Sequence, residues 1–128
     1  MSQALFDIHQ WVGYLVSVVV LVAAVMAFSR AKDAREFSKG PYVGAMVLLD
    51  VQVLIGLILY GVDGYWEAGP MIAYVHPLLA LGALGAGHAL VGRAKKQQMA
   101  VEAHRTAGRG LVIAFVLVLA AIGVASAF

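Results

Sequence analysis

The sequence predicts an all-α protein, a membrane-spanning antiparallel four-helix bundle in up-down-up-down order. Of its 128 residues, 62% are hydrophobic and 12% are charged, whereas soluble domains are close to half apolar and about a quarter charged. Four apolar runs lie near residues 4–28, 42–61, 71–92 and 108–127. Each can cross a bilayer, which takes about 20 helical residues. Little chain lies outside them, so we expect a single domain, residues 1–128, embedded in the lipid bilayer.

The basic residues predict the orientation of this bundle. They follow the first run or surround the connection before the fourth, at Arg30, Lys32, Arg35, Lys39, Arg93, Lys95, Lys96, Arg105 and Arg109. The opposite side carries Asp7, Asp63 and Glu67 and no Lys or Arg. The positive-inside rule therefore places both basic segments in the cytoplasm and both termini outside, in the inner (cytoplasmic) membrane. It also accounts for the positive charge without a nucleic-acid partner.

The first run contains a histidine near its outer end. Trp11 and Tyr14 suit the interfacial aromatic belt, and His9 lies about a turn inside. Gly13 and Ser17 follow at four-residue steps, so they share its helix face and leave room for a neighbouring helix or a flat ligand. A histidine inside a lipid-spanning helix is costly, which favours a functional role with a partner.

The second run has two polar residues near its middle, Asp50 and Gln52. Gln52, Gly56 and Tyr60 share one face, and Asp50 points almost oppositely. A carboxyl group at this depth costs about 2.5–3.5 kcal/mol, so we expect Asp50 to be protonated, hydrogen-bonded or both. Asp50 is a candidate for a proton relay or a partner to a histidine N–H; the alternative is a structural bond to a neighbouring helix.

The third run opens with a histidine above a stripe of small residues, and the fourth run contains no candidate functional residue. His76, Ala80, Ala83 and Gly87 lie at steps of four, three and four. Pro77 is tolerated because it sits in the first turns. The fourth run has no ionisable residue after Arg109, which is typical of a packing helix.

His9 and His76 are predicted to lie at the same depth, because each is about five residues inside the same membrane surface. In an up-down-up-down bundle the first and third helices are diagonal neighbours. Two imidazoles facing each other across such a core bind six-coordinate heme iron. We therefore expect heme b with His9 and His76 as metal ligands. A zinc or copper site would need more ligands at this level, where only Asp7 is available; two unrelated histidines are the remaining alternative.

A second metal site at His88 and His104 is a weaker hypothesis. His88 lies about 18 Å from His76 along the helix axis. His104 sits among Arg and Lys residues before the fourth run, where a solvated interfacial position is the simpler interpretation. The absence of cysteine excludes thiolate-bound iron–sulfur clusters and covalent heme attachment.

The arrangement resembles a four-helix half of the heme A synthase family. The matching positions are His9, Gln52 with Gly56, Gly61 or Gly64, and His76 with Ala80. They cover the first three runs, about two-thirds of the chain. The resemblance implies heme bound through the two histidines, with Gln52, Gly56 and Ala80 beside it and Gly13 facing the same space.

The departures from that family bear on activity. The glutamate three residues before the first histidine is Phe6 here, followed by Asp7; the arginine after that histidine is Gln10, and the cysteine pair is absent. Heme hydroxylation is therefore not expected, and whether the protein is an oxidoreductase enzyme stays open. We expect electron transfer or heme handling in a respiratory assembly, with quinol or a redox protein as partner, in a homodimer or a larger complex. The alternatives are a non-catalytic small structural subunit and a proton or ion transporter that uses Asp50.

Overall fold

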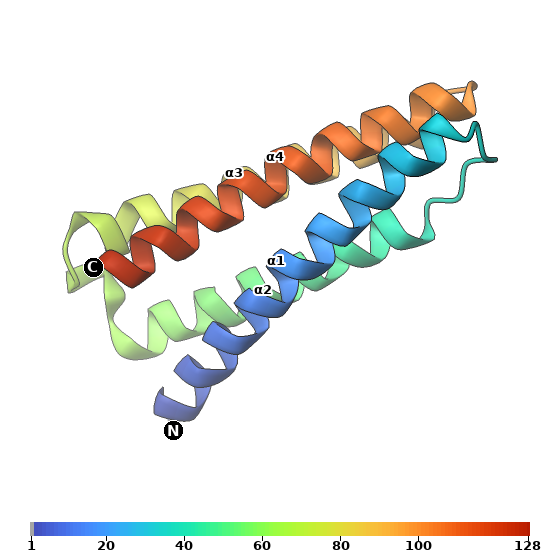
Figure 1. Cartoon of the computed structure of the whole chain (residues 1–128). Coiled ribbons are helices and arrows are strands. Elements are labelled where there is room, and N and C mark those ends of the chain that lie inside the picture. Colours follow the sequence, from blue (N-terminus) through green and yellow to red (C-terminus); the bar gives the residue numbers. More distant parts are fainter. Residues whose placement is uncertain (1) are drawn as a thin grey trace.

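The computed structural model describes residues 2–128, with the side chains from residue 3 onward (Figure 1). Its elements are α1 (Ser2–Lys32), α2 (Gly40–Asp63), the 3₁₀ turn η1 (Tyr65–Glu67), the π-helical turn η2 (Met71–Val75), α3 (His76–Ala94) and α4 (Ala100–Ala127). This part of the chain contains no strand. Four helices are long and apolar enough to span a membrane, η2 and α3 together forming the third. The predicted all-α bundle of four membrane helices is confirmed.

The helices have the up-down-up-down arrangement. α1 packs against α2 and α4, while α3 packs closely against α4 and more loosely against α2, so α1 and α3 are diagonal neighbours. Both termini and the connection at residues 64–70 lie at one end of the bundle, called here the terminal end (Figure 1). The connections at residues 33–39 and 95–99 lie at the other, called here the basic end.

The fourth helix begins at Ala100, eight residues earlier than the apolar run predicted. Its first turns are amphipathic: Ala103, Thr106 and Ala107 are buried, while Glu102 and Arg105 are exposed. A search for continuous apolar sequence misses such a segment, because half of each turn is polar.

The expected solvated position of His104 is wrong, because the side chain is completely buried (0% exposed). The hydroxyl of Tyr42 lies 2.7 Å from His104 Nδ1. The other ring nitrogen, Nε2, lies 3.0 Å from the carbonyl oxygen of Arg35. Nε2–H donates to that carbonyl, so Nδ1 accepts from Tyr42. His104 thus joins α4, α2 and the segment after α1 into a clasp at the basic end.

The two halves of the bundle diverge from this clasp. Figure 1 shows α1 with α2 as one pair and α3 with α4 as another, and the pairs separate toward the terminal end. The largest buried apolar side chains, including Met46, Leu49 and Leu111, fill the middle of the bundle and its basic half. The terminal end is left with a cavity.

Candidate functional site: two facing histidines in a membrane cavity

The cavity at the terminal end has a volume of about 420 Å³. Ligand sites in proteins have volumes of roughly 300–1,000 Å³ and are mainly apolar with a few polar groups. All four helices and η1 line this one, and Leu49, Val53, Ile72 and Val118 are among its apolar residues. Its size and chemistry suit an organic ligand more than a bare ion.

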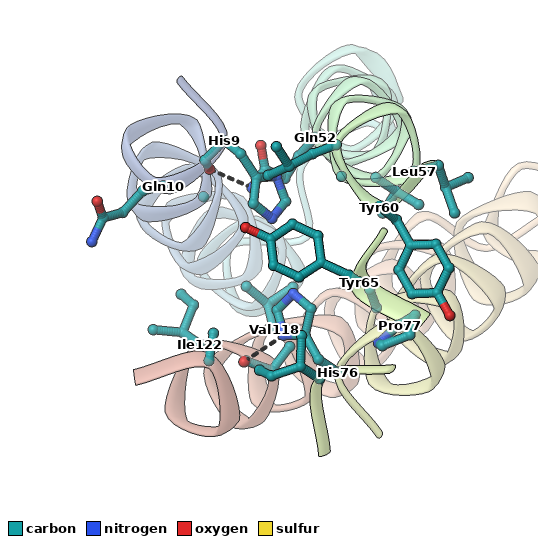
Figure 2. A pocket seen from close by; sticks show the side chains of 18 of the residues that line it. His9, Gln10, Gln52, Leu57, Tyr60, Tyr65, His76, Pro77, Val118 and Ile122 are labelled. Atoms are coloured by element: carbon teal, nitrogen blue, oxygen red, sulfur yellow. Dashed lines mark hydrogen bonds between the residues drawn. The ribbon is translucent and has the colours of Figure 1, made fainter. Parts of the chain in front are cut away.

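His9 and His76 enter the cavity from its two sides. Their ring centroids are 6.2 Å apart and the ring planes are inclined at 81°. Figure 2 shows the two imidazoles pointing toward one another. An imidazole nitrogen binds a metal at about 2.0–2.1 Å, so two nitrogens on opposite sides of one ion stand about 4 Å apart and their ring centroids about 6 Å apart. The observed separation fits one metal ion between the rings.

A hydrogen bond to α4 selects the tautomer of His76. Its Nδ1 lies 2.7 Å from the backbone carbonyl oxygen of Ala121, to which it can only donate a proton. Nε2 therefore keeps its lone pair. Metal-binding histidines commonly donate their other N–H to a carbonyl in this way, which fixes the ring and its tautomer.

The backbone before His76 is held by a second bond. Pro77 has no N–H to offer the carbonyl of Ala73, four residues earlier. The hydroxyl of Tyr60, near the end of α2, donates to that carbonyl at 3.0 Å. Residues Met71–Val75, directly before His76, form the π-helical turn η2. This conformation often occurs at functional sites. Tyr60 thus anchors the turn from which His76 projects.

His9 is packed against α2 through two glycines and a glutamine. A β-carbon at Gly56 would lie 2.8 Å from Cε1 of His9, and one at Gly13 would lie 2.9 Å from Nε2 of Gln52. The Gln52 amide donates to the backbone carbonyl of His9 at 2.7 Å. The three residues that the sequence associates with His9 therefore surround it in the structure.

Two buried atoms beside His9 have no hydrogen-bond partner within the described chain: Nδ1 of His9 and Oε1 of Gln52. They are complementary, because a protonated Nδ1 donates and an amide oxygen accepts. The structure shows no bond between them, so of the two histidines only His76 has its tautomer set by a hydrogen bond. The two facing imidazoles, one of them with a free Nε2 lone pair, fit a bis-histidine metal group.

Tyr65 lines this cavity from η1. In the view of Figure 2 its ring appears between the two histidines, and it is one of the lining residues, as is Ala80 deeper along α3. Burial, and then the negative charge of Asp63, raise the pKa of the Tyr65 phenol. The hydroxyl therefore stays protonated and available as a donor. The sequence candidates did not include Tyr65, whose only signal is its place in a short loop between two spans.

The structure gives His88 and His104 different partners. Nε2 of His88 lies 2.6 Å from Oδ1 of Asp50, while both nitrogens of His104 are used within the clasp. His104 has no lone pair free for a metal, and the pair proposed as a second site does not form. Over residues 2–128 there is no group of three or more His, Asp or Glu side chains suited to a metal ion.

No protein-family model, curated protein or solved structure matches this chain.

Proposed function

We propose that this protein binds one heme b between His9 and His76 and serves as an electron-transfer protein of the inner membrane, with both termini outside. The observation that carries the proposal is the pair of imidazoles from diagonal helices, 6.2 Å apart in a largely apolar cavity. The bond from His76 to Ala121 adds the tautomer that iron needs.

His9 and His76 would hold the heme iron as its two protein ligands, and a bis-histidine iron would have no open coordination position, which favours electron transfer over oxygen chemistry. When bound, the heme supplies a one-electron couple. The protein keeps the rings in place through Gln52, Gly56 and the Ala121 carbonyl, and it excludes water with its apolar lining. Such burial is one of the ways in which a protein sets the potential of a bound heme.

The heme carboxylates would meet neutral donors in this site. No Lys or Arg is among the residues that line the cavity, whereas Gln10, Tyr14, Tyr65 and Ser126 are. The protonated phenol of Tyr65 suits this task best, because its hydroxyl can donate and η1, where it lies, connects two membrane-spanning helices.

The resemblance to half of a heme A synthase supports heme binding without hydroxylation. Phe6, at the position of the family's glutamate, lines the cavity with a hydrocarbon side chain. The neighbouring Asp7 is exposed and accepts a hydrogen bond from Gln3 instead. The cavity therefore lacks the carboxylate that the catalytic half of the family carries there.

The test is an optical spectrum of the purified protein, oxidised and then reduced with dithionite. We expect a Soret band and sharp reduced α and β bands at one heme per chain. His9→Ala and His76→Ala should lose them, whereas His88→Ala, which removes a histidine outside the cavity, should keep them. A colourless protein with no Soret shift after hemin is added would contradict heme binding and favour a structural subunit.

A further inference from the structure

A second polar site lies on the outer surface of the bundle, between α2 and α3. Asp50 and His88 are bonded across this gap at 2.6 Å, yet their side chains are 42% and 50% exposed. Asp50 lies about 15 Å along α2 from its first residue and about 20 Å from its last, at 1.5 Å per residue. An apolar bilayer core about 30 Å thick would therefore surround the pair with lipid.

Each partner keeps one unused polar atom. Within the described chain, Oδ2 of Asp50 and Nδ1 of His88 have no hydrogen bond. Lipid tails offer neither donors nor acceptors, so such atoms are costly unless a ligand or another protein meets them. The missing partner must combine a donor for the carboxylate with a group that pairs with the imidazole.

The pair is also close to the heme cavity. Leu49, the residue before Asp50, lines the cavity wall. Gly56, which touches His9, lies six residues further along α2, about 9 Å along the axis. A ligand held by the pair would therefore lie on the basic-end side of the cavity, about 9 Å along α2 from Gly56 and about 18 Å along α3 from His76, and it would reach its place directly from the lipid.

We propose that Asp50 and His88 bind the head group of a lipid-soluble quinol and of its oxidised quinone. This inference rests on the proposed electron-transfer function and names its redox partner. Oδ2 of Asp50 accepts a hydrogen bond from a quinol hydroxyl, and an Nδ1–H of His88 donates to a quinone carbonyl. One donor and one acceptor side by side thus match both oxidation states of the ring.

The experiment uses an azido-substituted quinone as a photolabel on the full chain in lipid nanodiscs, with mass spectrometry to locate the adducts. We expect adducts on α2 and α3 near Asp50 and His88, and competition by unmodified quinone. Asp50→Asn and His88→Ala should raise the half-saturating quinone concentration about tenfold or more, since each replaces or removes one of the groups that hydrogen-bond the head group. Asp63→Asn, which neutralises a carboxylate at the end of α2, is the matched control and should bind normally.

Adducts spread evenly over the lipid-facing helices, adducts confined to the His9–His76 cavity, or unchanged affinity in both variants would each overturn the quinone site. The labelling is repeated on the heme-free His76→Ala protein, so that quinone binding is measured separately from heme binding. If labelling fails while the Soret band is intact, the quinone site is rejected and heme binding stands. If the site is labelled specifically but the protein never binds heme, only heme binding is rejected.

Discussion

The imidazole of His9 occupies space beside Gly56 that the side chain of any larger residue would fill. The nearest ring atom would lie 2.8 Å from an added β-carbon, closer than carbon atoms approach without a shift. The ring cannot move away freely, because Gln52 holds the backbone of the same residue. The position of His9, the proposed heme ligand, thus depends on the absence of a methyl group on the neighbouring helix.

We therefore expect Gly56→Ala to lower the heme content of the purified protein severalfold and to shift its Soret band. Gly61→Ala is the matched control, because nothing lies within 4 Å of its added β-carbon. Alanine is favoured over glycine in a helix interior by about 0.5–1 kcal/mol, so the control should be at least as stable as the parent. Equal heme content in the two variants would show that this contact does not position His9.

For single residues, the sequence predicts how deep a side chain lies in the membrane, but it does not predict how each helix is rotated about its own axis. The levels of His9 and His76 follow from counting residues at a constant helical rise, and the structure brings the two rings together. Whether His88 turns toward α4 or α2 depends on the rotation of α3 about its axis, which tertiary packing decides. In the structure His88 faces α2 and pairs with Asp50. A histidine N–H was one of the partners that the sequence suggested for the Asp50 carboxyl group.

The turn η2 illustrates what happens at the scale of an element. Pro77 leaves the Ala73 carbonyl without the N–H of residue 77 as a donor. Tyr60, on a different helix, donates to that carbonyl instead. Neither the π-helical geometry nor this bond is predictable from the third run alone, because both depend on how the end of α2 meets the start of α3.

Tyr60→Phe should remove this bond and lower the free energy of unfolding by about 0.5–1.5 kcal/mol. Because the bond anchors the turn before His76, heme should also dissociate faster from the variant. Thermal denaturation and heme transfer to an acceptor protein measure the two effects. Tyr74→Phe, an exposed tyrosine on η2 itself, is the control and should change neither.

The clasp at the basic end is a second element that the sequence did not reveal. His104→Leu removes the bonds to the Tyr42 hydroxyl and the Arg35 carbonyl, and the buried Tyr42 hydroxyl left without a partner costs about 1–3 kcal/mol. We expect a large loss of thermal stability and an unchanged Soret band for the protein that folds. Tyr42→Phe removes one of the same bonds, so its effect should not add to that of His104→Leu. Loss of heme absorbance from folded His104→Leu protein would reopen the second metal site.

For the whole molecule, hydropathy was sufficient to predict the class of fold, because each span must satisfy its backbone within itself. The ends of the helices were less predictable, since amphipathic turns such as the start of α4 carry charges that end an apolar run. The orientation proposed from the positive-inside rule can be tested directly in a chain that has no cysteine of its own.

Two variants each introduce one cysteine. Glu67→Cys should react with a membrane-impermeant maleimide in intact spheroplasts, whereas Ser38→Cys should react only after the membrane is permeabilised. Glu67 lies in η1 at the terminal end, and Ser38 lies in the connection at the basic end. Both side chains are exposed, so a difference in labelling reports the side of the membrane. The reverse pattern would place the termini in the cytoplasm.

The divergence of the two helix pairs has a consequence for the order of assembly. The clasp and the core residues outside the cavity, such as Val20, Met46, Val91 and Leu111, join all four helices, so we expect the chain to reach its tertiary structure in the membrane before a cofactor arrives. Under the proposed function, heme loading is then the last step of biogenesis, and it occurs at the terminal end, where the cavity lies. We expect a cell short of heme to hold folded, membrane-inserted protein that could be loaded later without new synthesis.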